Sequence, residues 1–437
     1  MTSPTPSPLE VQFPLASHPT RRAILRGGST LLAASSVLPM ARGFHSGSSS
    51  AIKVGLIGCG GRGTGAAYNA LMAGEDVKLW AVADAFREPM ENALLSLLGK
   101  PELAGRIDVA PTRRFQGFHG YLGVIESCDV VLLATPPFFR PEHIRAVAQA
   151  GKHLFAEKPV AVDAPGVRSV MESAQKIKAQ NKSLVAGLCY RYENAKRETI
   201  RRIHEGAIGR ILSAQTTYNT GGLWHQGRKA HWSELEYQVR NWLYFSWLSG
   251  DHINEQHIHS LDKVAWAMGD RYPVSATSSG GRSQRTEAKY GNIFDHFNTV
   301  YEWQDGTKCF SSCRQWTGAA SDVSDHIVGE RGVAHLMSAS IDGANPWRWK
   351  SEDPDDMYQN EMDALFASIR ANKPIYDGDI MARSTLMAIM ARMSAYTGQT
   401  ITWDQALASV EDLTPLGYAE GYPELASVAI PGVTTFS

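Results

Sequence analysis

The sequence IKVGLIGCGGRG, from Ile52 to Gly63, decides the fold of this chain. Its apolar first half is typical of a buried parallel strand, and its second half places Gly58, Gly60 and Gly63 at the GxGxxG spacing. A segment compatible with a helix follows from Thr64 to Leu71. In such a unit the first glycine permits a tight turn and the second lets the backbone approach a pyrophosphate. The third lets the helix pack closely on the strand, with the phosphates at its N-terminus.

A second apolar strand, Val77 to Ala83, supports dinucleotide binding because it ends in Asp84. That acid lies about 20 residues beyond the last glycine, where such folds place a carboxylate on the adenosine ribose. A carboxylate accepts from a ribose 2′-OH and repels a 2′-phosphate, so Asp84 favours NAD over NADP, although Arg87 nearby weakens that preference. A glycine-rich turn with a purely structural role is the alternative. The residues assigned to the cofactor are Gly58, Gly60, Gly63, Arg62, Asp84, Thr135, Glu157 and Lys158.

Length and composition narrow the class of protein. With 437 residues the chain is long enough for two or more domains. Its formal net charge of -1 gives no indication of nucleic-acid binding or of a basic membrane-binding face. The five cysteines are scattered and odd in number, and Cys309 and Cys313 lack two further ligands at zinc-finger spacing. The cysteines therefore predict neither a disulfide framework nor a structural metal site.

The N-terminal segment, residues 1–50, does not resemble domain material. The sequence TRRAILR at Thr20–Arg26 resembles the twin-arginine export motif, and a mildly apolar stretch follows from Gly27 to Met40. That stretch is too short and too polar to span a bilayer permanently. We therefore predict a signal and leader over residues 1–50, export by the twin-arginine pathway and a periplasmic location. A disordered basic leader is the alternative.

After Asp84 the predicted strands and helices alternate. Strands are predicted at Arg106–Ala110, Asp129–Thr135, His153–Ala156 and Leu184–Leu188, and helices at Pro141–Ala150 and Pro165–Gln180. Gly151 marks the end of the first of these helices. This alternation implies a doubly wound parallel sheet that binds ligands at the carboxyl ends of its strands, where Asp84 and Lys158 both fall. We predict a Rossmann dinucleotide-binding domain over residues 51–189.

The character of the chain changes at about Tyr190. A helix is predicted at Ala195–Glu205, a hairpin turn at the Asp-Gly of Gln304–Thr307, and a helical tail from Met357 to Ala408. The fold class is therefore α/β, with the Rossmann-type sheet followed by an α+β domain over residues 190–437. That domain holds a large, mostly antiparallel open sheet for substrate binding and oligomerisation. Its predicted strands are Ile211–Asn219, Val274–Ser279, Phe294–Trp303, Lys308–Gln315, Ser324–Val328 and Gly332–Leu336.

Glu157-Lys158-Pro159, directly after a predicted parallel strand, is the second informative motif. Proline biases the preceding residue toward extended geometry, so Lys158 is expected to leave the strand end pointing into the cleft. An ammonium there can hydrogen-bond a substrate hydroxyl and stabilise negative charge that develops on its oxygen. A solvated lysine at a strand end is the alternative.

The third motif is GDHINEQHIHSLD at Gly250–Asp262. Laid on one helix, four of its polar residues share a face: His252, Glu255, Gln256 and His259. A histidine with a pKa near neutrality is a natural base for a hydroxyl proton, and Asp262 is close enough in sequence to approach His259. A catalytic base with an orienting carboxylate and a set of structural histidines both remain open. A metal site drawn from His252, Glu255, His257 or His259 is the third alternative, although the order is not HExxH and our prediction for a metal is none.

Together the three motifs resemble the Gfo/Idh/MocA family of glucose–fructose oxidoreductases and inositol dehydrogenases. The resemblance extends from about Ala51 to Ala408 and rests on Gly58-x-Gly60-x-x-Gly63, Glu157-Lys158-Pro159 and Glu255-x-x-x-His259-x-x-Asp262. It implies that Lys158 and His259 serve substrate binding and proton transfer. The chain departs from the family pattern at Glu255, where aspartate is usual, and at His257, where glycine is common.

The resemblance implies an NAD(P)-dependent oxidoreductase that acts on a secondary hydroxyl of a sugar or glycoside. His259 is the expected general base, Lys158 polarises the hydroxyl, and Glu255 is the third catalytic residue. A redox glycosidase, whose tightly bound NAD cycles through a keto-sugar intermediate, and a non-catalytic cofactor-holding protein are the alternatives. The expected cofactor is NAD, with NADP as an option.

Substrate contacts are the least specific part of the prediction. The aromatic stretch Leu223–Trp247 either stacks on sugar rings or packs inside the protein. The expected partners are a small carbohydrate and further copies of the chain in a homodimer or homotetramer, with no nucleic acid and no permanent membrane span. The residues assigned to substrate are Arg191, Tyr192, Trp242, His257 and Asp262.

Overall fold

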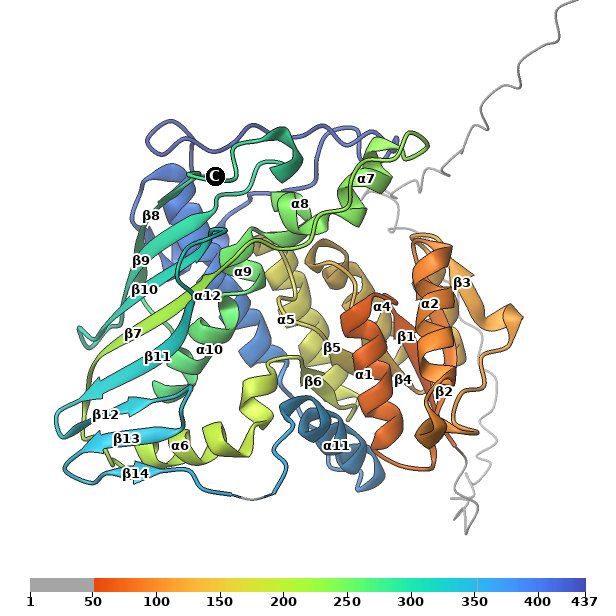
Figure 1. Cartoon of the computed structure of the whole chain (residues 1–437), viewed down its shortest axis with the longest axis horizontal. Helices are drawn as coiled ribbons and strands as arrows, with labels where there is room; N and C mark the ends of the chain where they lie inside the picture. The colour runs from red at the N-terminus through yellow and green to blue at the C-terminus, as the bar shows by residue number, and fades with distance from the viewer. Residues whose placement is uncertain (1–50, 352) are drawn as a thin grey trace, which may run out of the picture.

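The computed structural model describes residues 51–351 and 353–437. The predicted leader at residues 1–50, with its twin-arginine motif, lies outside the described residues. Two sheets organise the described part of the chain, and Figure 1 shows helices lying between them. None of the described helices is long and apolar enough to cross a membrane.

The first sheet is parallel and has six strands in the order β3-β2-β1-β4-β5-β6. The strand order reverses between β1 and β4, and ligands of such sheets bind outside the carboxyl ends of the strands at this point. The strands are β1 (Ile52–Ile57), β2 (Val77–Asp84), β3 (Arg114–Gln116), β4 (Val130–Leu133), β5 (His153–Ala156) and β6 (Leu184–Ala186). The helices between them are α1 (Gly61–Met72), α2 (Arg87–Leu98), α3 (Gly120–Ser127), α4 (Arg140–Ala150) and α5 (Ala164–Ala179).

Local sequence explains these elements. The whole of β4 is buried, as expected for a parallel strand that has helices on both faces of its sheet. Helix α4 ends at Gly151, whose φ of 65° lies in the left-handed region that glycine adopts without strain. Helix α5 begins where the side chain of Asp163 accepts a hydrogen bond from the backbone N–H of Gly166. The doubly wound sheet predicted from the sequence is confirmed.

The second sheet is mixed and mostly antiparallel, as predicted, with nine strands in the order β14-β13-β12-β11-β7-β10-β9-β8-β15. Within it β7 and β10 run parallel, whereas the other paired strands are antiparallel. Buried and accessible residues alternate along β10, so one face of the sheet packs on helices and the other is open. The strands are β7 (Ile211–Thr220), β8 (Ser275–Gly281), β9 (His296–Glu302), β10 (Lys308–Gln315), β11 (Asp322–Gly329), β12 (Gly332–His335), β13 (Ser340–Gly343), β14 (Trp347–Arg348) and β15 (Ile401–Thr402).

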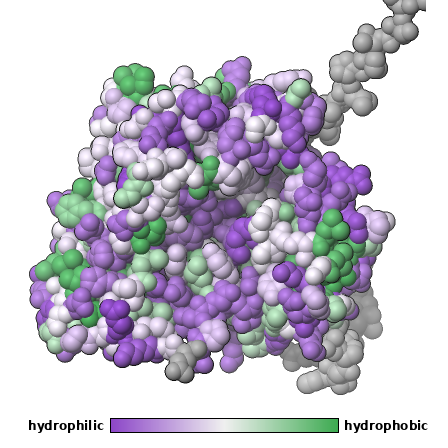
Figure 2. Space-filling model, in the orientation of Figure 1, coloured by the Kyte–Doolittle hydropathy of each residue, from purple (hydrophilic) through white to green (hydrophobic). Residues whose placement is uncertain are grey.

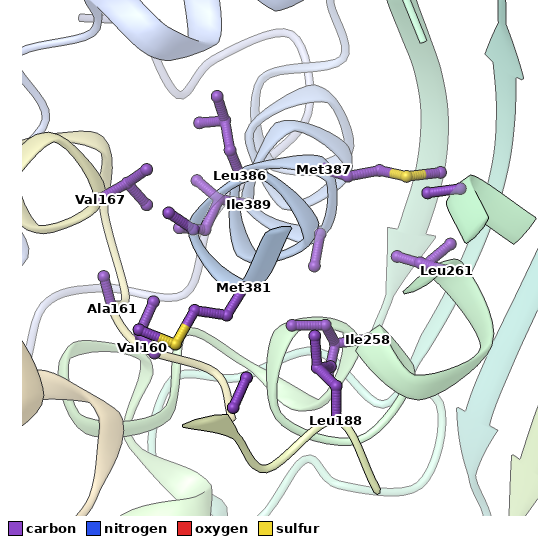
Figure 3. Packing of buried hydrophobic residues seen from close by; sticks show 14 of the residues in the cluster. Val160, Ala161, Val167, Leu188, Ile258, Leu261, Met381, Leu386, Met387 and Ile389 are labelled. Carbon is purple, nitrogen blue, oxygen red and sulfur yellow. The ribbon is translucent and has the colours of Figure 1, made fainter. Parts of the chain in front are cut away.

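Two helices from the C-terminal part of the chain connect the sheets. Helix α11 (Met357–Arg370) returns to the first sheet and packs on α1, where Asn69 Nδ2 donates to Gln359 Oε1 at 3.0 Å. Helix α12 (Gly378–Thr397) contacts both α5 and β8 and is buried over most of its length. Its apolar side chains belong to one cluster with those of neighbouring segments, and Figure 3 labels Val160, Ala161, Val167, Leu188, Ile258, Leu261, Met381, Leu386, Met387 and Ile389. This shared core fixes the ends of the parallel strands against the helices of the second sheet.

The remaining helices surround the second sheet or lead into it. They are α6 (Asn194–His204), α7 (Glu234–Arg240), α8 (Ser246–Ser249), α9 (His252–Glu255), α10 (Ile258–Ala267) and α13 (Trp403–Ala408). Figure 1 shows α10 lying against β7 and β11, and contacts between these elements agree with that view.

Two details of the secondary structure differ from the sequence-based prediction. The strand predicted at Arg106–Ala110 is wrong: Ile107 makes one isolated bridge to Leu79, and a 3₁₀ turn with Pro111 at its start interrupts the chain before β3. Strands β13, β14 and β15 were not predicted. They are two to four residues long, too short for an alternating pattern to be visible in the sequence.

Candidate active site

A cavity of about 520 Å³ opens at the carboxyl ends of β1, β2 and β4. Its walls include the predicted glycine loop, Asp84 and Thr135. The face of the molecule drawn in Figure 2 is largely hydrophilic and is hollowed near its centre. The opposite wall of the cavity comes from the second half of the chain and includes Trp224, Gln226, Val239, Arg240 and Trp242.

The three glycines of the loop differ in what a side chain would meet. A Cβ at Gly63 would lie 1.9 Å from the carbonyl oxygen of Gly58, so the close approach of α1 to β1 requires glycine there. Gly58 has a φ of 90° and would place a Cβ 2.7 Å from the backbone of Ala134. A Cβ at Gly60, by contrast, meets no atom within 4 Å, although this residue lines the cavity. Gly60 therefore leaves an open approach at the start of α1, which is the kind of space a pyrophosphate needs.

Asp84 lies where a ribose-binding acid belongs. Its Oδ2 accepts from the backbone N–H of Cys59 at 2.8 Å and its Oδ1 from that of Phe86 at 3.0 Å, which fixes the carboxylate beside the glycine loop. Burial raises the pKa of Asp84, against the opposing effect of these hydrogen bonds. Arg87, which weakened the preference for NAD, pairs with Glu91 at 2.6 Å on the surface of α2. The residues present therefore fit a dinucleotide, with the Asp84 carboxylate fixed beside the glycine loop.

Arg62 and Glu157 lie in one partly buried ion network, in which the Arg62 side chain is 33% exposed. Arg62 Nε pairs with Glu157, and its Nη2 lies 2.7 Å from Oε1 of Glu361, which is fully buried on α11. The guanidinium also lies over the ring of Tyr358, 4.5 Å from its centroid. Burial and, next, the charge of Glu157 raise the pKa of Glu361 well above its usual value. Sequence reasoning missed Glu361, for which the available signal was an acidic residue on an otherwise inward-facing position of a helix.

Lys158 contacts Glu255, another residue assigned to catalysis from the sequence. The Lys158–Pro159 peptide bond is cis. Lys158 Nζ donates to the backbone oxygen of Glu255 at 2.6 Å and to its Oε1 at 3.2 Å, and both side chains are about seven-eighths buried (12 % and 13 % exposed). The strand end of the first sheet is thereby joined to the end of α9 in the second half of the chain.

His259 lies in the first turn of α10 and is partly exposed. Its Nδ1 is buried and has no hydrogen-bond partner within the part of the chain that the structure describes, which leaves Nε2 as the nitrogen available to a ligand. The edge of its ring meets the ring of Tyr190, with centroids 5.3 Å apart. Burial, followed by the positive charges of Lys158, Lys263 and Arg62, lowers the pKa of His259 well below its usual value. The imidazole is therefore neutral at physiological pH and able to accept a proton.

The predicted single helical face from His252 to His259 is corrected by the structure. Helix α9 ends at Glu255 and α10 begins at Ile258, so His252 and His259 belong to different helices. His252 Nδ1 lies 3.1 Å from Asp251 Oδ1, and its ring packs on Phe297. Helix α9 is one turn long, and its N-cap residue Asp251 has a φ of 70°. Glu255, at the end of α9, contacts Lys158.

The other sequence-predicted substrate residues are held inside the protein. His257 is buried, its Nε2 lies 2.6 Å from Ser311 Oγ, and burial lowers its pKa to about 3. Asp262 does not turn to His259 but forms a bidentate pair with Arg191, with contacts of 2.8 and 2.9 Å. Tyr192 donates its hydroxyl to Asp377 at 2.6 Å. Among residues 51–351 and 353–437, no group of three or more His, Cys, Asp or Glu side chains is arranged to hold a metal ion.

The aromatic stretch Leu223–Trp247 divides between two environments. Trp224 and Trp242 line the cavity beside the glycine loop. The other aromatic residues of the stretch are buried in a hydrophobic cluster against which Trp242 also packs: Trp232, Tyr237, Tyr244, Phe245 and Trp247. Arg240 joins this stretch to the first sheet, because it pairs with Glu88 at 2.9 Å and lies 3.9 Å from the centroid of the Phe86 ring.

Substitutions of single glycines distinguish residues that leave space for the cofactor from residues that the packing of the loop requires. Gly60→Ala is expected to keep the stability of the protein and to weaken NADH binding by more than about tenfold, because its methyl group enters the space for the phosphates. Gly63→Ala is expected to destabilise the fold as well. Gly65→Ala, whose nearest neighbour would be Arg62 Nη1 at 3.7 Å, is the matched control in the same helix. Thermal unfolding and NADH fluorescence titration measure both effects, and wild-type NADH affinity in Gly60→Ala would contradict this placement of the phosphates.

The fold and the cavity define a nucleotide-binding protein with a second, mostly antiparallel sheet. Residues 52–184 match the model of the Gfo/Idh/MocA family, described as an oxidoreductase family with an NAD-binding Rossmann fold. A solved structure of scyllo-inositol dehydrogenase from Lactobacillus casei with bound NAD(H) and scyllo-inositol has the same fold, with a TM-score of 0.61 and 17% identity over 81% of this chain and 99% of that one.

Curated relatives are also similar to the chain. It is 24% identical over 360 residues to inositol 2-dehydrogenase of Acidiphilium cryptum (strain JF-5), which covers 78% of this chain and 94% of that protein. It is 28% identical over 200 residues to 2,7-anhydro-N-acetylneuraminate hydratase of Escherichia coli (strain K12), over 46% of this chain and 48% of the hydratase. The second match therefore spans about half the length of the relative. The nucleotide-binding part carries the family's sequence pattern, and the two-sheet fold is that of the inositol dehydrogenase structure.

Proposed function

We propose that the whole chain is a Gfo/Idh/MocA-type, NAD-dependent oxidoreductase that acts on a secondary hydroxyl of a sugar, polyol or glycoside. The observation that carries the proposal is the pairing of Lys158 Nζ with Glu255, which joins the strand end at Lys158 to the segment that leads into α10 and His259. The ammonium of Lys158 is close enough to act on the imidazole and lower its pKa, although the two residues come from different halves of the chain. Similarity to an inositol dehydrogenase supports a polyhydroxylated substrate.

The residues that would hold the dinucleotide are those that line the cavity. Gly60 and the N-terminus of α1 would bind the pyrophosphate, and Asp84 would bind the adenosine ribose. Thr135, which follows β4, would form part of the cavity wall. When bound, the nicotinamide group supplies a hydride acceptor. Arg62 and Glu157 would act on this site through their partly buried ion network rather than as free groups.

The chemistry assigned to the protein's own residues is proton transfer and charge stabilisation. Neutral His259 would accept the hydroxyl proton at Nε2, since its Nδ1 is enclosed. Lys158 would donate a hydrogen bond to the same oxygen and stabilise the negative charge that develops on it. Glu255 would keep that ammonium in place through its two contacts with Nζ.

A reaction without net oxidation is the second candidate, and the similarity to a hydratase favours it. In that case, as in a redox glycosidase, the same proton-transfer residues would act on a sugar that is oxidised and reduced again within one turnover. The site as described serves both reactions, because both begin with removal of a hydroxyl proton.

Location and assembly are further proposals. The TRRAILR sequence of the leader supports export by the twin-arginine pathway to the periplasm. The open face of the second sheet, where Phe310 of β10 is 53% exposed, supports association into homodimers or homotetramers.

A panel of inositols, sugars and glycosides, each incubated with NAD or with NADP, tests the proposed function. We expect NADH absorbance to rise with one class of polyol or sugar and NAD to be preferred over NADP. Product release without accumulation of NADH would favour the second candidate. A folded protein that binds NADH but converts nothing in the panel, by either readout, would contradict an enzymatic role.

A further inference from the structure

Behind His259 lies a buried ion pair that the proposed chemistry does not use. Lys263 is one turn after His259 on α10, and its Nζ lies 2.7 Å from Oδ2 of Asp325 on β11. The side chains of Lys263 and Asp325 are 1 % and 0 % exposed, respectively. Two opposite charges are thus enclosed at the contact between α10 and the second sheet.

The ammonium of Lys263 connects this pair to the imidazole through an aromatic ring. Lys263 Nζ lies 4.0 Å from the centroid of the Tyr190 ring, within the range of a cation–π interaction. The same ring meets His259 edge-on, with centroids 5.3 Å apart. Asp325, Lys263, Tyr190 and His259 therefore form one continuous set of contacts that ends at the proposed base.

Stability alone does not account for this arrangement. Apolar side chains of similar volume commonly replace a buried ion pair without loss of stability. Besides Asp325 and the Tyr190 ring, Lys263 has a weak contact with Met337 Sδ at 3.0 Å. Among the described residues the carboxylate of Asp325 has no partner besides Lys263. The property that apolar side chains would not reproduce is a fixed positive charge close to the imidazole.

The charges around His259 come from several elements. Lys158 follows β5, Arg62 lies on α1, and Lys263 lies on α10; all three act on the imidazole. Lys158 and Arg62 each face carboxylates at the site, Glu255 for the first and Glu157 and Glu361 for the second. Lys263 faces the imidazole from the same helix, and its counter-ion is on the sheet.

We propose that Lys263 and Asp325 are positioning residues for His259: the pair holds the Tyr190 ring against the imidazole and keeps a positive charge behind it, which orients the imidazole. This inference rests on the proposed role of His259 as the base. Neither residue contacts the substrate or the dinucleotide in this assignment. Both act on His259 indirectly, through the Tyr190 ring and through the electric field of their charges.

The test is a titration of His259 in protein labelled with ¹³C at histidine Cε1, followed by NMR without substrate and assigned with His259→Asn. In Lys263→Met we expect His259 to titrate at higher pH than in the wild type, because loss of a nearby positive charge favours the imidazolium. The acidic limb of the kcat/KM profile should move in the same direction. Lys263→Arg, which keeps the charge, should restore the wild-type titration.

The controls separate this role from a structural one. Lys196→Met removes another buried lysine, which pairs with Glu193 at 2.7 Å and also contacts Met337, and it should leave the titration of His259 unchanged. If Lys263→Met does not fold, the double variant Lys263→Met/Asp325→Asn leaves no isolated charge and should show a smaller shift in the same direction. An unchanged His259 titration in either folded variant would overturn the proposal. Because no turnover is needed, this result is independent of whether the proposed reaction is found.

Discussion

Replacing His259 by asparagine is expected to lower kcat/KM by about 10³-fold, in line with the loss of a general base. The amide retains a polar group of similar reach but does not accept the hydroxyl proton at neutral pH. NADH affinity should stay close to that of the wild type, because the cavity beside the glycine loop is lined by other residues. Steady-state kinetics and NADH fluorescence titration measure the two quantities on the same preparation.

A surface histidine provides the matched control. His204 lies at the end of α6, where its Nε2 is 2.9 Å from the backbone oxygen of Trp266. His204→Asn should therefore leave both kcat/KM and NADH affinity unchanged. Wild-type turnover in a folded His259→Asn variant would show that His259 is not the general base, whatever the substrate is.

Lys158→Met is the second substitution with a large expected effect, a decrease in kcat of about 10²–10³-fold. Methionine keeps much of the length of the lysine side chain but donates no hydrogen bond to the substrate oxygen. Because the charge of Lys158 also lowers the pKa of His259, its loss should move the acidic limb of the pH–rate profile to higher pH. The activity that remains would then disappear earlier as the pH falls.

Glu255→Gln is a milder change at the same contact and is compared with Lys158→Met. It removes the negative charge beside Lys158 Nζ and keeps the backbone oxygen, which is the closer of the two acceptors. We therefore expect a smaller loss of kcat than in Lys158→Met. An equal or larger loss would mean that the carboxylate of Glu255 acts in the reaction directly rather than through the lysine.

The parts of the fold that could be predicted from the sequence are those fixed by local patterns. The apolar run of β1, the spacing of Gly58, Gly60 and Gly63, and the helix end at Gly151 each follow from the requirements of a few neighbouring residues. The mostly antiparallel second sheet was also visible, because its longer strands alternate in burial. The proximity of Lys158 and Glu255 came from a family resemblance rather than from local pattern.

Other features depend on contacts that local pattern does not contain. Glu361 meets Arg62 because α11 returns to the first sheet nearly 300 residues later in the chain (a separation of 299). The division of the aromatic stretch Leu223–Trp247 between the cavity and a hydrophobic cluster follows from packing against Phe139 and Ile293. The break between α9 and α10 was hidden because the same pattern of polar residues continues across both helices.

The central claim is that Lys158 and His259 act on a hydroxyl-bearing carbon beside a dinucleotide held at the glycine loop. The measurement that tests it most directly is isotope transfer: the substrate found in the panel is deuterated at the carbon that bears the reacting hydroxyl, and the nicotinamide is analysed by mass spectrometry after a single turnover. The account predicts deuterium in the nicotinamide with wild-type protein and none with His259→Asn. Substrate conversion by the wild type with no deuterium in the nicotinamide would contradict it.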